Sequence, residues 1–152
     1  MAMRTGTAQR ESFDLVGLST RASNDDPRPI GALWGRSGEL RGEVAGALDD
    51  DLWAVYCEYE SDHTRPYTFF LGRRVGTGAA APAGLARRTV PAGTYAVVPA
   101  HGPQPATLIA TWQAIWAMPL DRTYVADVER HPADDPERVE ILVGVRPPRR
   151  TR

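Results

Sequence analysis

The sequence predicts an α+β domain made of two copies of one β-α-β-β module, with antiparallel strands in one layer and two main helices in another. An internal repeat is the first reason: the run Phe-Asp-Leu-Val-Gly-Leu at 13–18 corresponds to Tyr-Ala-Val-Val-Pro-Ala at 95–100. The second reason is that each run precedes a tryptophan-containing stretch with helical spacing, at 28–48 and 106–117. Two modules related by a pseudo-two-fold axis leave a seam, where we expect a ligand cleft.

The chain of 152 residues is expected to form a single domain over 1–152, because this length suits one hydrophobic core. The pseudo-repeats are expected over about 4–75 and 85–146. The stretch 76–84, rich in glycine and alanine, is expected to be a linker between them. The basic, proline-rich tail 147–152 is expected to be flexible.

The first copy contains a helix that the sequence itself weakens. Pro27 follows a run of capping residues and suits the first turn of a helix over 28–48. Because Gly35 and Gly38 disfavour helix, we expect a break or kink there. The strands of this copy are expected over 13–21, 52–60 and 67–75.

The second copy repeats this order, and a short strand is expected to precede each copy. A helix is predicted over 106–117 because Leu108, Ile109, Trp112, Ile115 and Trp116 form an apolar stripe, which ends before a proline. The strands of this copy are expected over 86–91, 94–100, 122–130 and 138–145.

Composition and charge exclude several classes of function. The net charge of −1 gives no general attraction to nucleic acid or to anionic membranes. All 18 basic residues are arginine, so neither lysine Schiff-base chemistry nor a phosphate-loop lysine is available. The sequence contains no signal peptide and no run of about 20 apolar residues. We therefore expect a cytoplasmic protein with no direct contact with nucleic acid or membrane.

No metal ion or cofactor is expected. Cys57, the single cysteine, lies in an apolar strand pattern and is predicted to be a small buried residue. His63, His101 and His131 are far apart, and none has metal-ligand spacing from a cysteine. His63 and His131 each follow an acidic strand motif, so we expect both on the surface.

Carboxylates beside aromatic residues are the most suggestive chemical feature. Glu129 lies two residues from Asp127 in a predicted strand, and therefore on the same face. Glu58 and Glu60 repeat this spacing in the first copy. A carboxylate in a cavity requires a positive partner, which a guest cation can provide, and each aromatic face adds about 0.5–2 kcal/mol by cation–π contact. The alternative is that these acids face solvent or pair with arginines while the tryptophans pack in the core.

Seven motifs in order indicate a family. They are Phe13-Asp-Leu-Val-Gly-Leu-Ser19, Ile30-Gly-Ala-Leu-Trp34, Ala54-Val-Tyr-Cys-Glu-Tyr-Glu-Ser-Asp62, Tyr67-Thr-Phe-Phe-Leu-Gly72, Pro91-Ala-Gly-Thr-Tyr95, Trp112-Gln-Ala-Ile-Trp116 and Val139-Glu-Ile-Leu-Val-Gly-Val145. Over about 12–146 the chain resembles the GyrI-like small-molecule-binding domains, of the AraC-type effector-binding fold, in their integron-associated effector-binding branch.

The resemblance implies two modules facing each other across a cleft, with an acidic pocket residue that maps onto Glu129. Where the family usually has Phe-Glu-x-Tyr, this chain has Val-Glu-Arg-His at 128–131, so Arg130 is a competitor for the carboxylate. The chain contains no helix-turn-helix region. The leading prediction is stand-alone, multidrug-type binding or sequestration of bulky hydrophobic, cationic aromatic molecules. Its site residues are Glu129, Trp34, Tyr56, Tyr95, Trp112 and Trp116.

Three other functions stay open. Related proteins suggest hydrolysis of cyclopropane-bearing genotoxins, in which Glu129 would act as base and Tyr56 as acid. A regulator could instead bind a protein partner such as DNA gyrase or a separate transcription factor. Haem binding, known in related folds, is the weakest alternative, because no histidine is expected in the cleft.

Overall fold

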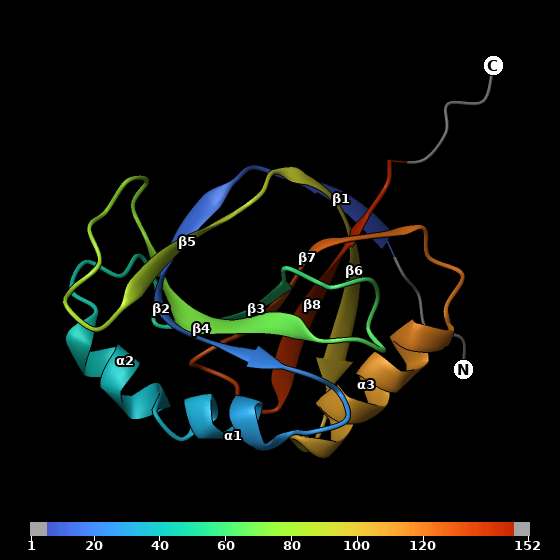
Figure 1. The fold of residues 1–152 in the computed structure, drawn as a ribbon, viewed down its shortest axis with the longest axis horizontal. Helices are drawn as coiled ribbons and strands as arrows, with labels where there is room; N and C mark the ends of the chain where they lie inside the picture. The colour runs from blue at the N-terminus through green and yellow to red at the C-terminus, as the bar shows by residue number, and fades with distance from the viewer. Residues whose placement is uncertain (1–5, 148–152) are drawn as a thin grey trace.

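The computed structural model describes residues 6–147, which form two copies of a β-β-α-β-β unit (Figure 1). The first copy comprises β1 (Gly6–Arg10), β2 (Phe13–Ala22), α1 (Arg28–Trp34), α2 (Ser37–Glu43), β3 (Leu52–Cys57) and β4 (Tyr67–Val75). The second comprises β5 (Ala86–Val90), β6 (Gly93–His101), α3 (Ala106–Ala117), β7 (Arg122–His131) and β8 (Arg138–Val145). This confirms the predicted α+β class and the duplicated module, each preceded by a short strand.

The strand order reveals the internal symmetry. All eight strands form one antiparallel sheet in the order β1-β6-β8-β7-β3-β4-β2-β5. The counterparts in the two copies are β1 and β5, β2 and β6, β3 and β7, and β4 and β8. Exchanging the members of each pair gives the same strand order read backwards, so the pseudo-two-fold axis passes between β3 and β7. In that strand pair Cys57 lies opposite Ala126, and these two residues directly precede Glu58 and Asp127, which the sequence repeat matches.

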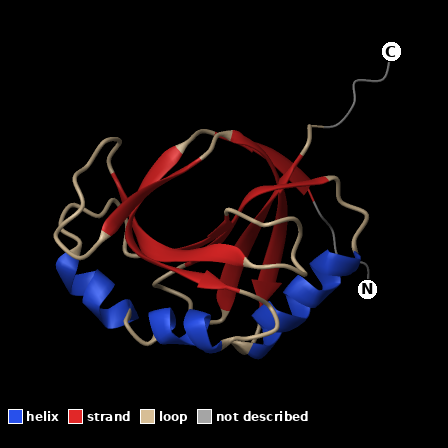
Figure 2. Ribbon diagram, viewed as in Figure 1, coloured by secondary structure: helices blue, strands red, loops and turns tan. Residues whose placement is uncertain are grey.

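The sheet is strongly curled. Only Glu11 and Ser12 connect β1 to β2, although these strands lie near opposite ends of the strand order. Pro91 and Ala92 alone connect β5 to β6 in the same way. The two ends of the sheet must therefore approach each other, and all three helices lie along one side of the curl (Figure 2).

Alternation along the strands divides the core into an inner and an outer layer. Along β3, Val55 faces the inside of the curl, whereas Ala54 and Tyr56 face the helices. The inner cluster comprises Leu15, Trp53, Val55, Cys57, Phe70, Val90, Tyr95, Ala126, Val128 and Leu142. Two further clusters lie between sheet and helices, one under α1 and α2 and the other under α3.

The helix predicted over 28–48 is interrupted, as expected from its glycines. α1 ends at Trp34 and α2 starts at Ser37, and Leu33 and Leu40 are the buried residues of the two pieces. α2 ends at Glu43, five residues before the predicted end. The prediction for α3 is confirmed residue for residue, with Thr111 and Ile115 buried.

The strand predicted over 52–60 is shorter than expected. β3 ends at Cys57, and Glu58 has a φ of 48°, which takes the chain out of the sheet. Glu58 and Glu60 are therefore not strand residues repeating the face of Asp127 and Glu129: both are exposed and form ion pairs with arginines. Cys57 is buried as predicted, and burial raises the pKa of its thiol to about 11.

The segment 76–84 joins β4 to β5 without helix or strand. It packs on the first copy, since the Gly78 N–H donates to the Asp14 carboxylate and Ala79 and Ala81 contact a small apolar cluster.

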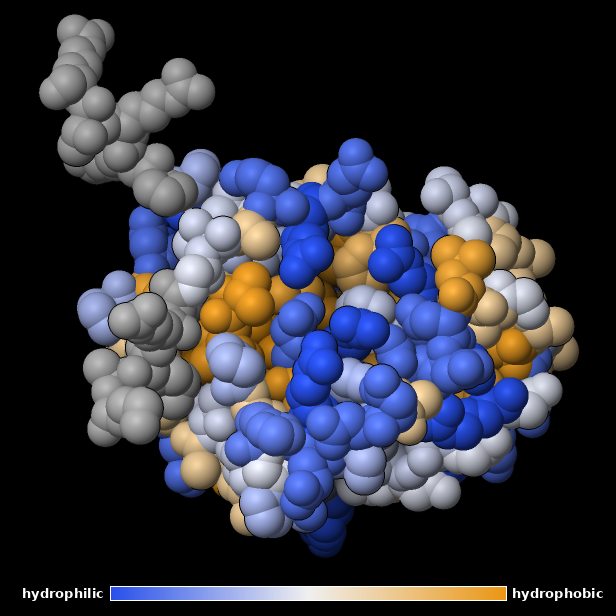
Figure 3. Space-filling model, turned by 180° about the vertical axis from the view of Figure 1, so that it is seen from behind, coloured by the Kyte–Doolittle hydropathy of each residue, from blue (hydrophilic) through white to orange (hydrophobic). Residues whose placement is uncertain are grey.

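Residues 4–5 and the tail beyond 147 lie outside the described residues. None of the helices within 6–147 combines the length and apolarity needed to cross a membrane. Seen from behind, hydrophilic side chains cover much of the surface, with hydrophobic ones showing between them (Figure 3).

Candidate functional site

A cavity of about 560 Å³ lies at the seam between the two copies. One wall comes from α1 and the residues before it, the opposite wall from α3, and the floor from β3 and β7. Its lining residues include Asn24, Ile30, Trp34, Tyr56, Tyr59, His63, Tyr67, Leu108, Trp112, Trp116, Arg122 and Glu129. The seam that the repeat predicted is therefore a hollow lined largely by aromatic side chains.

Glu129 is the acidic group of this cavity. Its side chain is 0% exposed yet borders the hollow. The Tyr56 hydroxyl and the Trp112 Nε1 donate to its Oε2 at 2.7 and 2.6 Å. Nε2 of His131 lies 2.8 Å from its Oε1. Partners from β3, α3 and β7 thus fix the carboxylate, as a buried charge requires.

Tyr56 is held as a hydrogen-bond donor. Burial, followed by the neighbouring Glu129 carboxylate, raises the pKa of Tyr56 well above its usual range. Its ring packs edge-on against Trp112 at 5.3 Å and against Phe69 at 5.2 Å between centroids. The phenol therefore stays protonated, and its orientation is set by packing.

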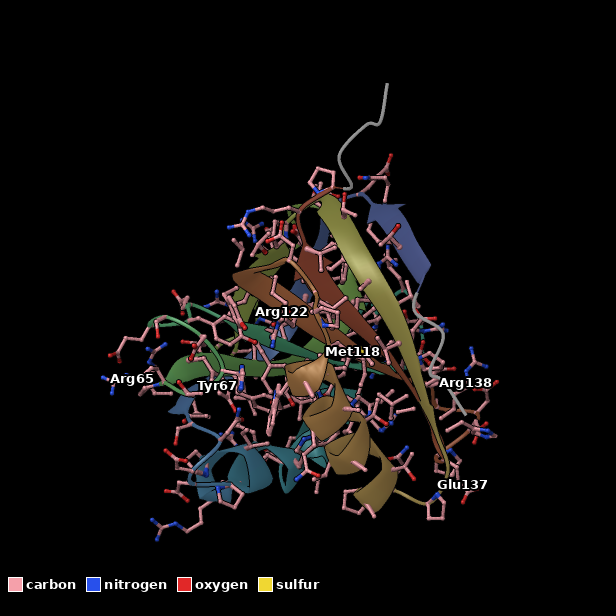
Figure 4. All side chains as sticks on the ribbon, turned by 90° about the vertical axis from the view of Figure 1, so that its right-hand side faces the viewer. Arg65, Tyr67, Met118, Arg122, Glu137 and Arg138 are labelled. Carbon is pink, nitrogen blue, oxygen red and sulfur yellow. The ribbon has the colours of Figure 1, made fainter. Side chains whose placement is uncertain are left out.

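A second buried carboxylate lies nearby but already has a full positive partner. Asp127 is 0% exposed and accepts from Arg122 Nη2 at 2.7 Å, from the Tyr59 hydroxyl at 2.5 Å and from the Gly144 N–H at 2.9 Å. Figure 4 labels Arg122, the first residue of β7, and Met118, which follows the last residue of α3. Within residues 6–147, Asp127 forms an ion pair with an arginine, whereas Glu129 forms none with an arginine.

The two histidines expected on the surface both belong to the site, which corrects that prediction. His63, from the loop between β3 and β4, stacks on Trp116 with centroids 5.0 Å apart and planes at 7°. Burial and the charge of Arg122 lower the pKa of His63. His131 bridges Glu129 and the edge of Trp34, whose ring centroid is 4.6 Å away. Both depart from expectation because the loop and the end of β7 fold against helices that are distant in sequence.

Five of the six predicted site residues line the cavity: Glu129, Trp34, Tyr56, Trp112 and Trp116. The structure does not bring Tyr95 there. Tyr95 is 4% exposed in the inner cluster of the curl, and its hydroxyl donates to the Pro91 carbonyl at 2.6 Å. Ala96 and Val98 of the same strand face α3 instead. Because side chains alternate along a strand, Tyr95 points to the opposite face of the sheet, away from the cavity.

Arg130 does not compete for Glu129. It pairs with Asp51 at 2.7 Å, and its guanidinium carbon lies 5.9 Å from the Trp53 ring centroid. Adjacent strand residues point to opposite faces, so Arg130 and Glu129 lie on opposite sides of the sheet.

Sequence reasoning missed Tyr59, Tyr67, His63 and Arg122. The two tyrosines continue the aromatic pattern that identified the site and could have been added on that ground. Arg122 gave no local signal, because its approach to Asp127 depends on a register shift in β7 between these two residues. Within the described part of the chain, no cluster of three or more His, Cys, Asp or Glu residues could hold a metal ion.

An aromatic cavity at the two-fold seam of a duplicated, curled sheet defines a small-molecule-binding domain. The sequence profile of the integron-associated effector-binding proteins matches residues 8–145. The chain belongs to this family, which confirms the resemblance drawn from the motifs.

Individual relatives agree with this assignment. YobU of Bacillus subtilis (strain 168), named as a candidate transcriptional regulator, is 30% identical over 146 residues, covering 86% of this chain and 89% of its own. An integron cassette protein from the mobile metagenome of Vibrio cholerae has a similar structure, with a TM-score of 0.76, 24% identity and coverage of 93% and 95%. SAV2435, solved with bound tetraphenylphosphonium, gives a TM-score of 0.74 at 18% identity, with coverage of 95% and 94%.

Proposed function

We propose that this protein binds bulky, hydrophobic, cationic aromatic molecules in the seam cavity, as an effector-binding or sequestering protein. The observation that carries the proposal is Glu129: a fully buried carboxylate with no arginine partner within residues 6–147, bordering a cavity walled by indole and phenol rings. A cationic guest supplies the missing positive charge.

The contacts of Glu129 favour a charged guest over a neutral one. Tyr56 and Trp112 donate neutral hydrogen bonds to one oxygen, and His131, 2.8 Å from the other, adds a positive charge only when it is protonated. These three contacts orient the carboxylate without a permanent counter-charge. The aromatic walls add cation–π attraction, and burial of apolar guest surface contributes about 25 cal/mol per Å². Because stacking has little directional demand, such a site accepts guests of varied shape.

The fold is suited to such a guest. SAV2435 shares the architecture and binds tetraphenylphosphonium, a bulky organic cation. At 18% identity this likeness is one of fold, and it supports the proposal because a protein of this fold binds a large aromatic cation.

Tryptophan fluorescence titration tests the proposal. The ligands are a biaryl carrying a trimethylammonium group and its neutral analogue with a tert-butyl group in that place. Glu129→Gln is expected to weaken the cation by roughly 1–3 kcal/mol, about 5- to 150-fold, and to leave the neutral analogue nearly unchanged. Glu60→Gln, at the matching position of the repeat, is the control and should change neither. Equal losses for both ligands in Glu129→Gln would overturn the counter-charge role.

Binding is better supported than hydrolysis. A general acid needs a pKa near the working pH, whereas the pKa of Tyr56 is raised well above 10. Oε2 of Glu129, the oxygen nearest Tyr56, already accepts two hydrogen bonds. Regulation through a protein partner and a cytoplasmic location stay predictions from the sequence and the family.

A further inference from the structure

The cavity has a second polar group, opposite in charge to Glu129. The Arg122 side chain is 5% exposed and lines the hollow. Its Nη2 binds Asp127, but Nε and Nη1 are buried and have no hydrogen-bond partner among residues 6–147. A guanidinium has donors only, so these two nitrogens require acceptor atoms.

His63 has a third unpaired atom, buried beside the same hollow. Its ring lines the cavity and lies flat against Trp116, and its buried Nδ1 has no partner in the described part of the chain. Burial and the Arg122 charge both lower its pKa, so the ring is neutral near pH 7. A neutral imidazole has one donor and one acceptor nitrogen, and can therefore complement a polar guest.

Three unpaired buried atoms around one cavity are uncommon. Most buried polar groups in folded proteins are paired, and three of the five unpaired buried side-chain atoms within residues 6–147 belong to these two cavity residues. These three come from β7 and from the β3–β4 loop, and both residues adjoin the tryptophans of α3. Their common surroundings indicate one acceptor group on a guest rather than unrelated defects.

Trp112 lies close to both the Arg122 guanidinium and the Glu129 carboxylate. Its indole N–H donates to Glu129, and its ring centroid lies 6.0 Å from the Arg122 guanidinium carbon. A guest stacked beside this indole therefore meets a negative group and a donor group on the same aromatic surface. Because Asp127 already compensates the Arg122 charge, the donor group suits a neutral oxygen better than a carboxylate.

We propose that the preferred ligand of the cavity carries, besides the cationic centre received by Glu129, a neutral carbonyl oxygen that Arg122 and His63 bind. The inference rests on the proposed function and narrows it. The ligand class is an aromatic amine or ammonium compound with a ketone or amide, rather than a purely hydrocarbon cation.

Two matched probes test the inference: a diarylmethane carrying a trimethylammonium group, and the same cation with a ketone in place of the bridging CH₂. The wild-type protein should bind the ketone about tenfold more tightly, as expected for a hydrogen bond to a charged donor. Equal affinities would overturn the inference, and they would leave the proposed function intact if Glu129→Gln weakened both probes.

Two variants test whether His63 and Arg122 cause the preference for the ketone probe. His63→Phe keeps a flat ring for Trp116 but removes Nδ1, and Arg122→Lys keeps a positive charge for Asp127 but removes the guanidinium fork. Both should lower the ratio of ketone affinity to CH₂-probe affinity, with the larger loss at Arg122. The control His101→Phe changes an exposed histidine outside the cavity lining and should keep the full preference.

The outcomes separate the two proposals. Glu129→Gln should weaken both probes alike and preserve the ketone preference. A preference that persists in folded His63→Phe and Arg122→Lys would show that solvent alone meets these atoms, and would refute the inference. If Arg122→Lys fails to fold, the His63→Phe result decides.

Discussion

The two copies of the module agree in frame and differ in chemistry, most clearly at their matching glutamates. Glu60 lies beyond the end of β3, has a side chain 47% exposed and pairs with Arg65. Glu129 lies within β7 and is fully buried. The first strand ends early because the chain turns away at Glu58, whereas β7 continues to His131. Residues matched by a repeat therefore need not have matched surroundings.

The helices differ as well. The first copy breaks its helix after Trp34, whereas the second keeps α3 intact over 12 residues. α3 lines the cavity with Leu108, Trp112 and Trp116 on one continuous face, and α1 contributes fewer residues. Duplication thus supplied a symmetric frame, and divergence of one copy supplied an asymmetric cavity.

The largest expected loss of stability comes from a close backbone contact in the first copy. Gly17 lies opposite Gly72 in the β2–β4 pair, and a Cβ on Gly17 would stand 2.0 Å from the Leu71 carbonyl oxygen. Gly17→Ala should therefore lower the free energy of unfolding by about 3 kcal/mol or more, measured by urea denaturation. Gly6→Ala, where the added Cβ meets no described atom within 4 Å, is the control. Similar losses in both variants would show that this contact does not constrain the sheet.

The next largest loss of stability is expected at two tyrosines with hydrogen-bonded hydroxyls, one from each copy. Tyr56 donates to a carboxylate and Tyr95 to a backbone carbonyl. Since hydrogen bonds to charged groups are stronger, Tyr56→Phe should lower the free energy of unfolding by about 2 kcal/mol and Tyr95→Phe by about 1 kcal/mol. Urea unfolding of the two variants in parallel checks this order. A reversed order would contradict the stronger hydrogen bond assigned to Tyr56.

The third effect is a pH dependence from His63. Burial and Arg122 lower its pKa in the folded protein, whereas an unfolded histidine titrates near 6.5. As pH falls through about 6.5, the unfolded state takes up the proton first, so stability decreases until the lowered native pKa is reached. Unfolding free energies at pH 7.5 and 5.5 should differ more in the wild type than in His63→Phe. An equal difference would argue against a lowered pKa of His63 in the folded protein.

The smallest effect is expected at Glu60. Its ion pair with Arg65 is short, 2.6 Å, but both side chains are largely exposed. Such surface pairs contribute little, so Glu60→Gln should leave the midpoint of thermal unfolding unchanged within error. A clear loss of stability would contradict the contrast drawn between the two glutamates.

Most of the fold could be predicted because its signals are local. Period-two alternation located the strands within a few residues, and Gly35 marked the interruption after α1. The repeat identified the symmetry and hence the seam. The overlong strand at 52–60 shows the limit, since the turn at Glu58 depends on a positive φ that its sequence does not require.

The amino-acid sequence by itself determined the repeated strands and helices and the acid at position 129, because spacing and alternation are properties of neighbouring residues. Only the tertiary structure decided which side chains meet. The curl directed Tyr95 inward, closed His63 onto Trp116 and brought Arg122 to Asp127. These contacts join residues far apart in the chain or across an irregular strand, where the geometry of the curled sheet rather than local preference sets the neighbours.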